Sequence, residues 1–163
     1  MSCLHLAAYL ASWGMYRGSS HLLQRSIRYY VGLIEVLQDH VGLFDIDISD
    51  YGKPDNRKSV VNCFNSIWDC LEIPTQTLVT KIMLGVFGCV PALDIYVKKT
   101  LGIKTINESA LNSIFKFYEN NSREIDSFTV YTLNFADGED TKIKYKQAKI
   151  IDMYAFIDEQ NNP

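Results

Sequence analysis

The fold of the chain is decided at TQTLVTKIMLGVFGCVPALDIYVKKTLG, residues 75–102. The first half of this stretch is apolar on almost every side after Lys81, and a helix of that kind usually lies at the centre of a protein core. Gly88 ends this helix, Pro91 allows another to begin, and Gly102 terminates the second one. The stretch therefore predicts two consecutive helices, the first of them central in the core.

Helical periodicity continues on both sides of this centre. It predicts further helices over residues 2–12, 21–40, 56–71 and 107–120, with a loop over 41–58. The alternating segments SFTVYTLNF and KIKYKQ, with a turn at Asp137-Gly138, predict an antiparallel hairpin. The last apolar block, IIDMYAFI, is open to either a short helix or a strand. The sequence thus predicts a mainly α fold, with about six helices and a small C-terminal antiparallel β-hairpin, in a single domain over residues 1–163.

Composition restricts the classes of function. The chain has 163 residues, is 47% hydrophobic and 21% charged, and carries a formal net charge of -3. These values are typical of an ordinary globular protein and exclude a disordered one. The net charge argues against wholesale binding of nucleic acid, for which a basic domain is expected, but it leaves room for a local basic patch.

The sequence also bears on location and on metals. No apolar run reaches about 18 residues, and the start, MSCLHLAAYLASW, lacks the basic region of a signal peptide. We therefore expect a cytoplasmic protein with no membrane partner. The four cysteines, Cys3, Cys63, Cys70 and Cys89, form no CxxC pair. We expect reduced thiols and neither a bound metal nor a cofactor.

Asp94 is the first candidate for chemistry. It falls in the first turn of the helix that follows Pro91, where the helix dipole and the free backbone amides favour a carboxylate. Its neighbours Leu93 and Ile95 are apolar, which predicts partial burial. Two interpretations stay open: an acid that closes the turn, and the carboxylate of a functional pocket.

The segment FGCVPALDIYVKK resembles part of the helix–hairpin–helix DNA glycosylases. In that family a Phe-Gly turn precedes a helix that opens with Val-Asp, followed by a ring, an aliphatic residue and a basic residue. The resemblance implies that Asp94 lines a base pocket and supports loss of a damaged base. It also implies that Tyr96 is the ring that follows and that Lys98 or Lys99 is the basic residue.

The chain departs from the glycosylase pattern just upstream, at IPTQTLVTK. The family has a glycine-rich hairpin there whose amides bind a DNA phosphate, and this stretch has no glycine. The lyase-type members also have a nucleophilic lysine at a position where Gln76 or Thr77 falls here. The resemblance therefore implies a monofunctional activity, in which Asp94 acts with an activated water, or a degenerate site without catalysis.

A second candidate site lies at YLASWGMYRGSSHLLQ, residues 9–24. One helix ends there and another begins, and exposed amides beside an arginine suit an anion. A flipped base needs an aromatic or apolar clamp, which this corner can supply. The alternative is a packed joint in which a serine caps the helix and the arginine pairs with Asp94 or Asp152. The candidate binding residues are Trp13, Tyr16, Arg17, Ser19, Ser20 and His21.

Three blocks, LHLAAYLASWGMYRGSSHLLQ, TKIMLGVFGCVPALDIYV and KIIDMYAFI, resemble a family of uncharacterised bacterial and phage-associated helical proteins. This resemblance spans most of the chain and implies no particular activity.

Two functional hypotheses follow. The first is a nucleic-acid-handling helical domain of DNA-glycosylase-like architecture, whose partner is nucleic acid or another anionic ligand. The second is a non-enzymatic protein–protein interaction module, for example in phage–host conflict. The first requires Asp94 and residues 13–21 to face one cleft with basic residues at its rim.

Overall fold

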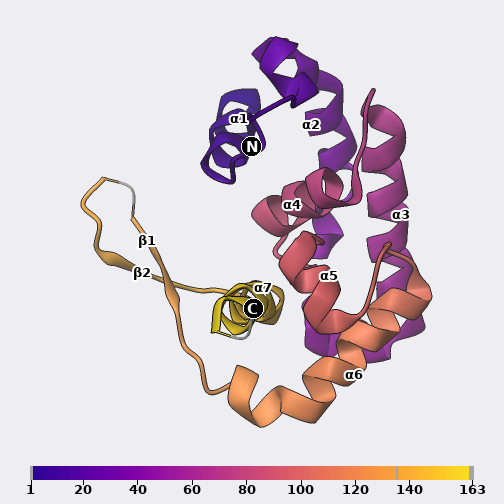
Figure 1. Ribbon diagram of the computed structural model, residues 1–163, viewed down its shortest axis with the longest axis vertical. Coiled ribbons are helices and arrows are strands. Elements are labelled where there is room, and N and C mark those ends of the chain that lie inside the picture. The colour runs from indigo at the N-terminus through magenta and orange to yellow at the C-terminus, as the bar shows by residue number, and fades with distance from the viewer. Residues whose placement is uncertain (1, 135, 162–163) are drawn as a thin grey trace.

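The computed structural model describes residues 2–134 and 136–161 and is mainly helical, with one small antiparallel sheet near the C-terminus (Figure 1). The predicted fold class is therefore confirmed. The described residues form these α-helices and strands: α1 (Cys3–Ser12), α2 (Val31–Gln38), α3 (Pro54–Cys70), α4 (Gln76–Val86), α5 (Ile95–Leu101), α6 (Glu108–Ile125), β1 (Tyr131–Leu133), β2 (Asp140–Lys144) and α7 (Gln147–Asn161). Four 3-10 helices lie between α1 and α3: η1 (His21–Gln24), η2 (Ile27–Tyr30), η3 (Val41–Asp45) and η4 (Ile48–Gly52).

The helix α4 lies at the centre of the molecule, as its apolar sequence predicts. It begins after Thr75, whose side chain accepts a hydrogen bond from the Leu78 amide at 3.1 Å. Seven of its eleven residues are buried, and one of these is Lys81. The chain leaves α4 through Gly88, which adopts a positive φ of 64° that other residues rarely reach. The core is thus built around a helix that carries one buried charge.

The helix after Pro91 begins later than predicted. It starts at Ile95 with Asp94 as its N-cap, and residues 89–94 are not helical. Side chains of α4 hold this segment in a non-helical form. The Thr80 hydroxyl accepts a hydrogen bond from the Leu93 amide at 2.7 Å, in place of the carbonyl that a helix would offer.

The predicted helix over residues 21–40 is wrong as a single element. The chain forms η1, η2 and then α2, because Arg25 and Ser26 adopt extended backbone angles between the first two. The Arg25 guanidinium forms an ion pair with Glu72, which holds this break against the loop after α3. The apolar periodicity is real, but it is shared among three short helices.

The predicted loop over 41–58 is also more ordered than expected. It contains η3 and η4, and α3 already begins at Pro54. Asp47 and Asp50 form a capping box at the start of η4. The helix α6 begins after Asn107, which caps the Ala110 amide at 2.8 Å, and it extends five residues beyond the predicted end, to Ile125.

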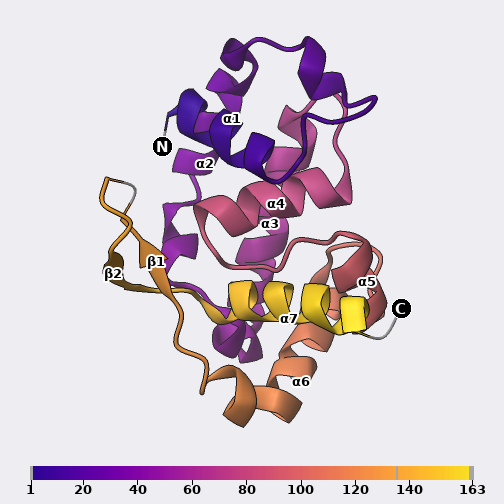
Figure 2. The same ribbon diagram turned by 60° about the vertical axis from the view of Figure 1, so that its left-hand side comes forward.

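The last apolar block is a helix, α7, which settles the open choice between helix and strand. Its first turn is fixed to η3 and η4, about a hundred residues earlier in the chain. The Asp47 carboxylate accepts hydrogen bonds from the amides of Gln147 at 2.8 Å and Ala148 at 3.2 Å. The Lys146 ammonium donates to the carbonyls of Phe44 at 2.6 Å and Ile46 at 3.0 Å. In Figure 2 α7 crosses in front of the helical body, beside α5.

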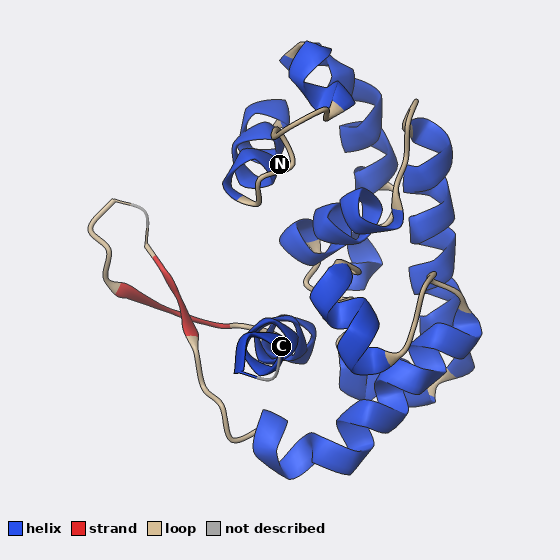
Figure 3. Ribbon diagram, viewed as in Figure 1, coloured by secondary structure: helices blue, strands red, loops and turns tan. Residues whose placement is uncertain are grey.

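The hairpin of β1 and β2 extends away from the helices, as Figures 1 and 3 show. The two strands are antiparallel, with Tyr131 opposite Lys144 and Leu133 opposite Asp140, and the register shifts between these pairs. Among the described residues, no helix is long and apolar enough to cross a membrane.

Candidate functional site

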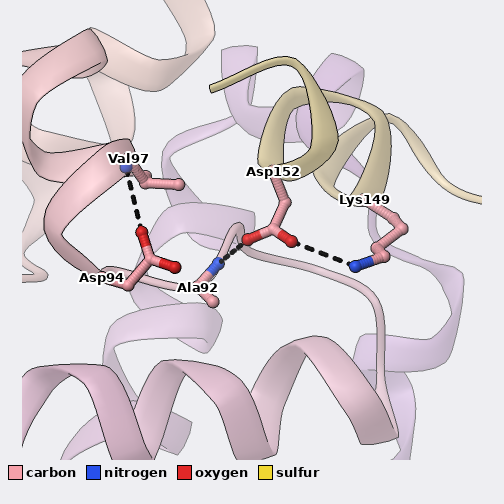
Figure 4. A network of polar contacts seen from close by, with 5 residues as sticks. All are labelled: Ala92, Asp94, Val97, Lys149 and Asp152. Carbon is pink, nitrogen blue, oxygen red and sulfur yellow. Dashed lines mark hydrogen bonds and ion pairs between the residues drawn. The ribbon is translucent and has the colours of Figure 1, made fainter. Parts of the chain in front are cut away.

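The irregular segment before α5 is fixed by side chains from two helices. On the α4 side, Thr80 holds the Leu93 amide, and the Thr77 hydroxyl donates to the Leu93 carbonyl at 2.8 Å. On the α7 side, the Asp152 carboxylate accepts from the Ala92 amide at 3.0 Å. Figure 4 shows Ala92 between the carboxylates of Asp94 and Asp152. The segment is therefore a rigid base for Asp94.

Asp94 caps α5 through one oxygen. Its Oδ1 accepts hydrogen bonds from the amides of Tyr96 at 3.0 Å and Val97 at 3.1 Å. The side chain is half-buried and also lines an open pocket. Because Oδ1 carries both cap bonds, Oδ2 is the oxygen that a ligand could meet. Asp94 thus closes the turn, as the first interpretation predicts, and it also lines a pocket.

Trp13, the C-cap residue of α1, lies close to this carboxylate and carries two cations over its ring. The Lys81 ammonium lies 4.4 Å from the ring centroid and the Lys149 ammonium 4.0 Å from it. Tyr9 contacts the same ring edge-on, with 6.2 Å between the centroids. Both ammonium distances are well within the range of cation–π attraction. A flat ligand that stacks on a face of Trp13 covered by one of these ammonium groups would have to displace that group.

The charges around Trp13 shift one another's ionisation. Lys149 forms an ion pair with Asp152 at 3.0 Å. Lys81 is 7% exposed, and burial lowers its pKa below the usual 10.5. The charge of Lys149 lowers the pKa of Lys81 further, while Asp94 and Asp152 act in the opposite direction. Burial raises the pKa of Asp152, whereas the charge of Lys149 and the hydrogen bond from the Ala92 amide lower it.

We call the cavity beside these groups the Trp13 pocket. It has a volume of about 420 Å³ and opens to solvent. Its walls are mostly apolar, with two carboxylates and one ammonium group among them. The lining residues are Trp13, Asp94, Lys149, Asp152, Met153, Phe156 and Ile157. An apolar pocket with a few polar groups is the usual form of a small-ligand site.

The remaining residues of the N-terminal corner line a different pocket. Arg17, Ser19, Ser20 and His21 lie there beside Ile73, Thr75 and Leu78, and this pocket shares no lining residue with the Trp13 pocket. The structure therefore divides residues 13–21 between two places. Trp13 joins Asp94, whereas the arginine, serines and histidine do not.

Contacts with residues nearby in sequence fix Ser20 and Arg17 of the second pocket. Ser20 donates to the Met15 carbonyl at 2.6 Å and caps η1 by accepting from the Leu22 amide at 3.3 Å. The exposed Arg17 side chain lies over Gly14, within 3.2 Å of the position that a Cβ would take there. Asp152, one proposed partner of this arginine, pairs with Lys149 instead. The His21 Nε2 atom is buried without a hydrogen-bond partner.

Three other candidates lie outside the lining of both pockets. The Tyr16 hydroxyl hydrogen-bonds to the Tyr30 hydroxyl at 2.6 Å, and burial together with this bond raises the pKa of Tyr30. The Tyr96 ring packs edge-on against Phe156, with 5.2 Å between the centroids, and so supports one wall of the Trp13 pocket. Lys98 is half-buried on α5, and its amide donates to the Asp94 carbonyl at 3.0 Å.

Sequence reasoning did not select the two lysines over Trp13. A signal for Lys81 is present, because it is the one charged residue of an otherwise apolar central helix. Lys149 and Asp152 are spaced three apart at the start of an apolar helix, which places them on one face. Their meeting with Trp13 depends on how α1 and α7 pack, which no local pattern encodes.

The site offers a carboxylate oxygen, an apolar wall and two ammonium groups within one region. Such groups can bind a ring with polar edges, or an anion attached to an apolar group. Within residues 2–134 and 136–161, no group of three or more histidine, cysteine, aspartate or glutamate side chains is arranged to hold a metal ion.

No protein-family model matches the chain, and no curated protein and no solved structure matches it at a significant level. The geometry of the chain therefore carries the functional argument by itself.

Proposed function

We propose that the protein handles nucleic acid, and that the Trp13 pocket receives an unstacked base. One observation carries the proposal: Trp13 and Asp94, which are separated by about eighty residues in sequence, line the same open pocket beside the ammonium group of Lys149. The nucleic-acid hypothesis requires residues 13–21 to share one cleft with Asp94, and of the six candidate residues in that stretch Trp13 alone lines this pocket.

The pocket has the parts that recognition of a base needs. An extruded base is held between aromatic or apolar side chains and is read through hydrogen bonds to its edge. Phe156 and Met153 supply apolar walls, and the Oδ2 atom of Asp94 supplies an acceptor for a base N–H group. Lys149 supplies the one ammonium group in the lining, which can attract a phosphate.

Catalysis is a separate part of the proposal. The Oδ2 atom of Asp94, which carries neither of the two cap bonds, can orient a water against the bond between base and sugar. Base release by the wild type, measured as oligonucleotide cleavage at abasic sites, would demonstrate catalysis, and Asp94→Asn should abolish it.

The binding test uses fluorescence anisotropy with labelled single- and double-stranded oligonucleotides at about 50 mM and about 200 mM salt. Phe156 is 45% exposed and lines the pocket, so Phe156→Ala removes one wall with little effect on the core. Phe128→Ala is the matched control, because Phe128 is 56% exposed and lies outside the Trp13 pocket.

The wild type should bind the single strand more weakly at the higher salt. Phe156→Ala should weaken binding by about tenfold, since one base–aromatic contact contributes about 1–3 kcal/mol. Phe128→Ala should bind like the wild type. An absence of salt-dependent binding would refute the proposal, and so would an equal loss in the two variants.

A second candidate function, a protein-interaction module, is favoured by the hairpin. Leu133 and Ile143 are 65% and 67% exposed there, on a part of the chain that extends away from the helices. Exposed apolar side chains of this kind often mark contact surfaces. A partner bound in this way should be lost in an Ile143→Ser variant and retained in Phe156→Ala, as measured by pull-down with both variants.

A further inference from the structure

The second pocket of the N-terminal corner, which the proposed function does not use, has the charge of a site for an anion. It has a volume of about 420 Å³ and opens to solvent. Of the described residues that line it, none is acidic, although the chain as a whole carries a formal net charge of -3. We call it the Arg17 pocket, after the arginine that lies there with Ser19, Ser20 and His21.

The Arg17 side chain is placed by the backbone and has no acidic partner. It lies against Gly14, where a Cβ would be 3.2 Å from the Arg17 Nε atom and 3.4 Å from its Cζ atom. No acid in the part of the chain that the structure describes pairs with Arg17, and Glu72, which precedes the lining residue Ile73, pairs with Arg25. A guanidinium group without such a partner can bind a carboxylate or a phosphate through two parallel hydrogen bonds.

Two further polar groups of the Arg17 pocket have unused capacity for hydrogen bonds. The exposed Ser19 side chain bonds to no other residue that the structure describes. The Nε2 atom of His21 is buried without a partner, whereas buried polar atoms in native proteins nearly always have one. Hydroxyl and imidazole groups can both donate to an oxyanion. The pocket therefore combines a cation with neutral donors.

The rest of the lining is apolar. Leu22 and Leu78 are 1% and 2% exposed, so they belong to the core and form the floor of the pocket. Ile73 is 50% exposed and forms part of its rim. A pocket of this size with a few polar groups on an apolar lining suits a small molecule rather than a bare ion.

We infer that the Arg17 pocket binds a small molecule that carries an oxyanion, either a carboxylate or a phosphate monoester, on an apolar body. Arg17 and Ser19 hold the oxyanion, and Ile73 covers the apolar body. This site shares no lining residue with the Trp13 pocket, and the inference does not depend on the proposed function.

The test is a titration of the full chain with hexanoate and with hexyl phosphate, followed by ¹H–¹⁵N NMR. Hexanol is the neutral probe with the same apolar body. Arg17→Gln removes the cation, and Arg28→Gln is its control, because Arg28 is exposed and lies outside the pocket. Ile73→Ala shortens the rim, and Ile27→Ala is its control, because Ile27 is 48% exposed and also lies outside the pocket.

At least one of the two anions should shift the amide signals of residues 14–21 in a saturable way, and the tighter of the two identifies the oxyanion. Hexanol should bind at least about tenfold more weakly. Arg17→Gln should weaken binding of the anion by about tenfold, which corresponds to about 1.4 kcal/mol, and Ile73→Ala should also weaken it. Both control variants should bind like the wild type.

Three results would overturn the inference: no saturable binding of either anion, hexanol that binds as tightly as the anions, or equal losses in Arg17→Gln and Arg28→Gln. Phe156→Ala, which alters the Trp13 pocket, should leave the affinity for the anion unchanged. A loss of anion binding in Phe156→Ala as large as that in Arg17→Gln would also contradict a separate site. The oligonucleotide assay with Phe156→Ala tests the Trp13 pocket, so the failure of either idea is recognised independently of the other.

Discussion

Removal of the Asp47 carboxylate tests how the last helix is attached to the molecule. Asp47 accepts hydrogen bonds from the amides of Gln147 at 2.8 Å and Ala148 at 3.2 Å, and from the Ile48 amide at 2.8 Å. One side chain therefore caps two helices, η4 and α7, that lie about a hundred residues apart in sequence. The Asp47→Ala variant leaves all three amides without this acceptor.

The expected loss follows from these contacts. Deletion of an N-cap side chain costs about 0.5–2 kcal/mol, and this carboxylate caps two helices. Burial raises the pKa of Asp47 although the three amides act to lower it, so the cost of burying the charge offsets part of the gain. We expect the free energy of unfolding to fall by about 2–4 kcal/mol, because amides left without partners in a half-buried site are costly.

Urea unfolding at neutral pH, followed by circular dichroism, measures this loss. Asp45→Ala is the matched control, because Asp45 is exposed in the same segment, and it should change stability by less than about 0.5 kcal/mol. Asp47→Asn should fall between the two variants, since its amide group keeps one acceptor oxygen. If Asp47→Ala lost no more stability than Asp45→Ala, this account of how α7 is attached would be refuted.

Three further outcomes are expected. Gly85→Ala should lose about 1–2 kcal/mol in urea unfolding, because a Cβ there would lie 2.2 Å from the Tyr9 ring and the strain exceeds the gain in helix propensity. Lys81→Met should be more stable than the wild type at pH 7. That advantage should shrink toward pH 10.5, because the lowered pKa of Lys81 means that the wild type gains stability as the lysine loses its proton. The raised pKa of Asp152 predicts that the wild type loses stability relative to Asp152→Asn as the pH rises from about 3.8, in unfolding curves from pH 3.5 to 7. The loss should be about 1.4 kcal/mol for each pH unit that separates the pKa of Asp152 in the folded protein from its pKa in the unfolded chain.

The central helix and its ends were predictable because their signals are local. An apolar run, most of which is buried, encodes α4. Gly88 and Gly102 follow the ends of α4 and α5, where the backbone adopts a positive φ. The break between η1 and η2 carries no such signal. Arg25, at this break, forms an ion pair with Glu72, which is far away in sequence. Periodicity alone therefore joined three short helices into one.

The site was predictable only in part, for the same reason. Asp94 was selected from its position near a helix start, which is a local property, and it does cap the helix and line a pocket. The sequence alone places residues 9–24 in one candidate site because they are adjacent there. In the structure, Trp13 faces α7 and the groups from Arg17 to His21 face the loop before α4, so neighbours in sequence serve different cavities.

The lining of the Trp13 pocket comes from the end of α1, from Asp94 before α5 and from α7, and this has a thermodynamic consequence. The pocket exists only while these elements are packed together, so a ligand of this pocket binds the folded state alone. At a ligand concentration about one hundred times its dissociation constant, such a ligand adds about 2.7 kcal/mol to the free energy of unfolding. Loosening α7 through Asp47 should therefore weaken binding at the distant pocket, although Asp47 lines no part of it.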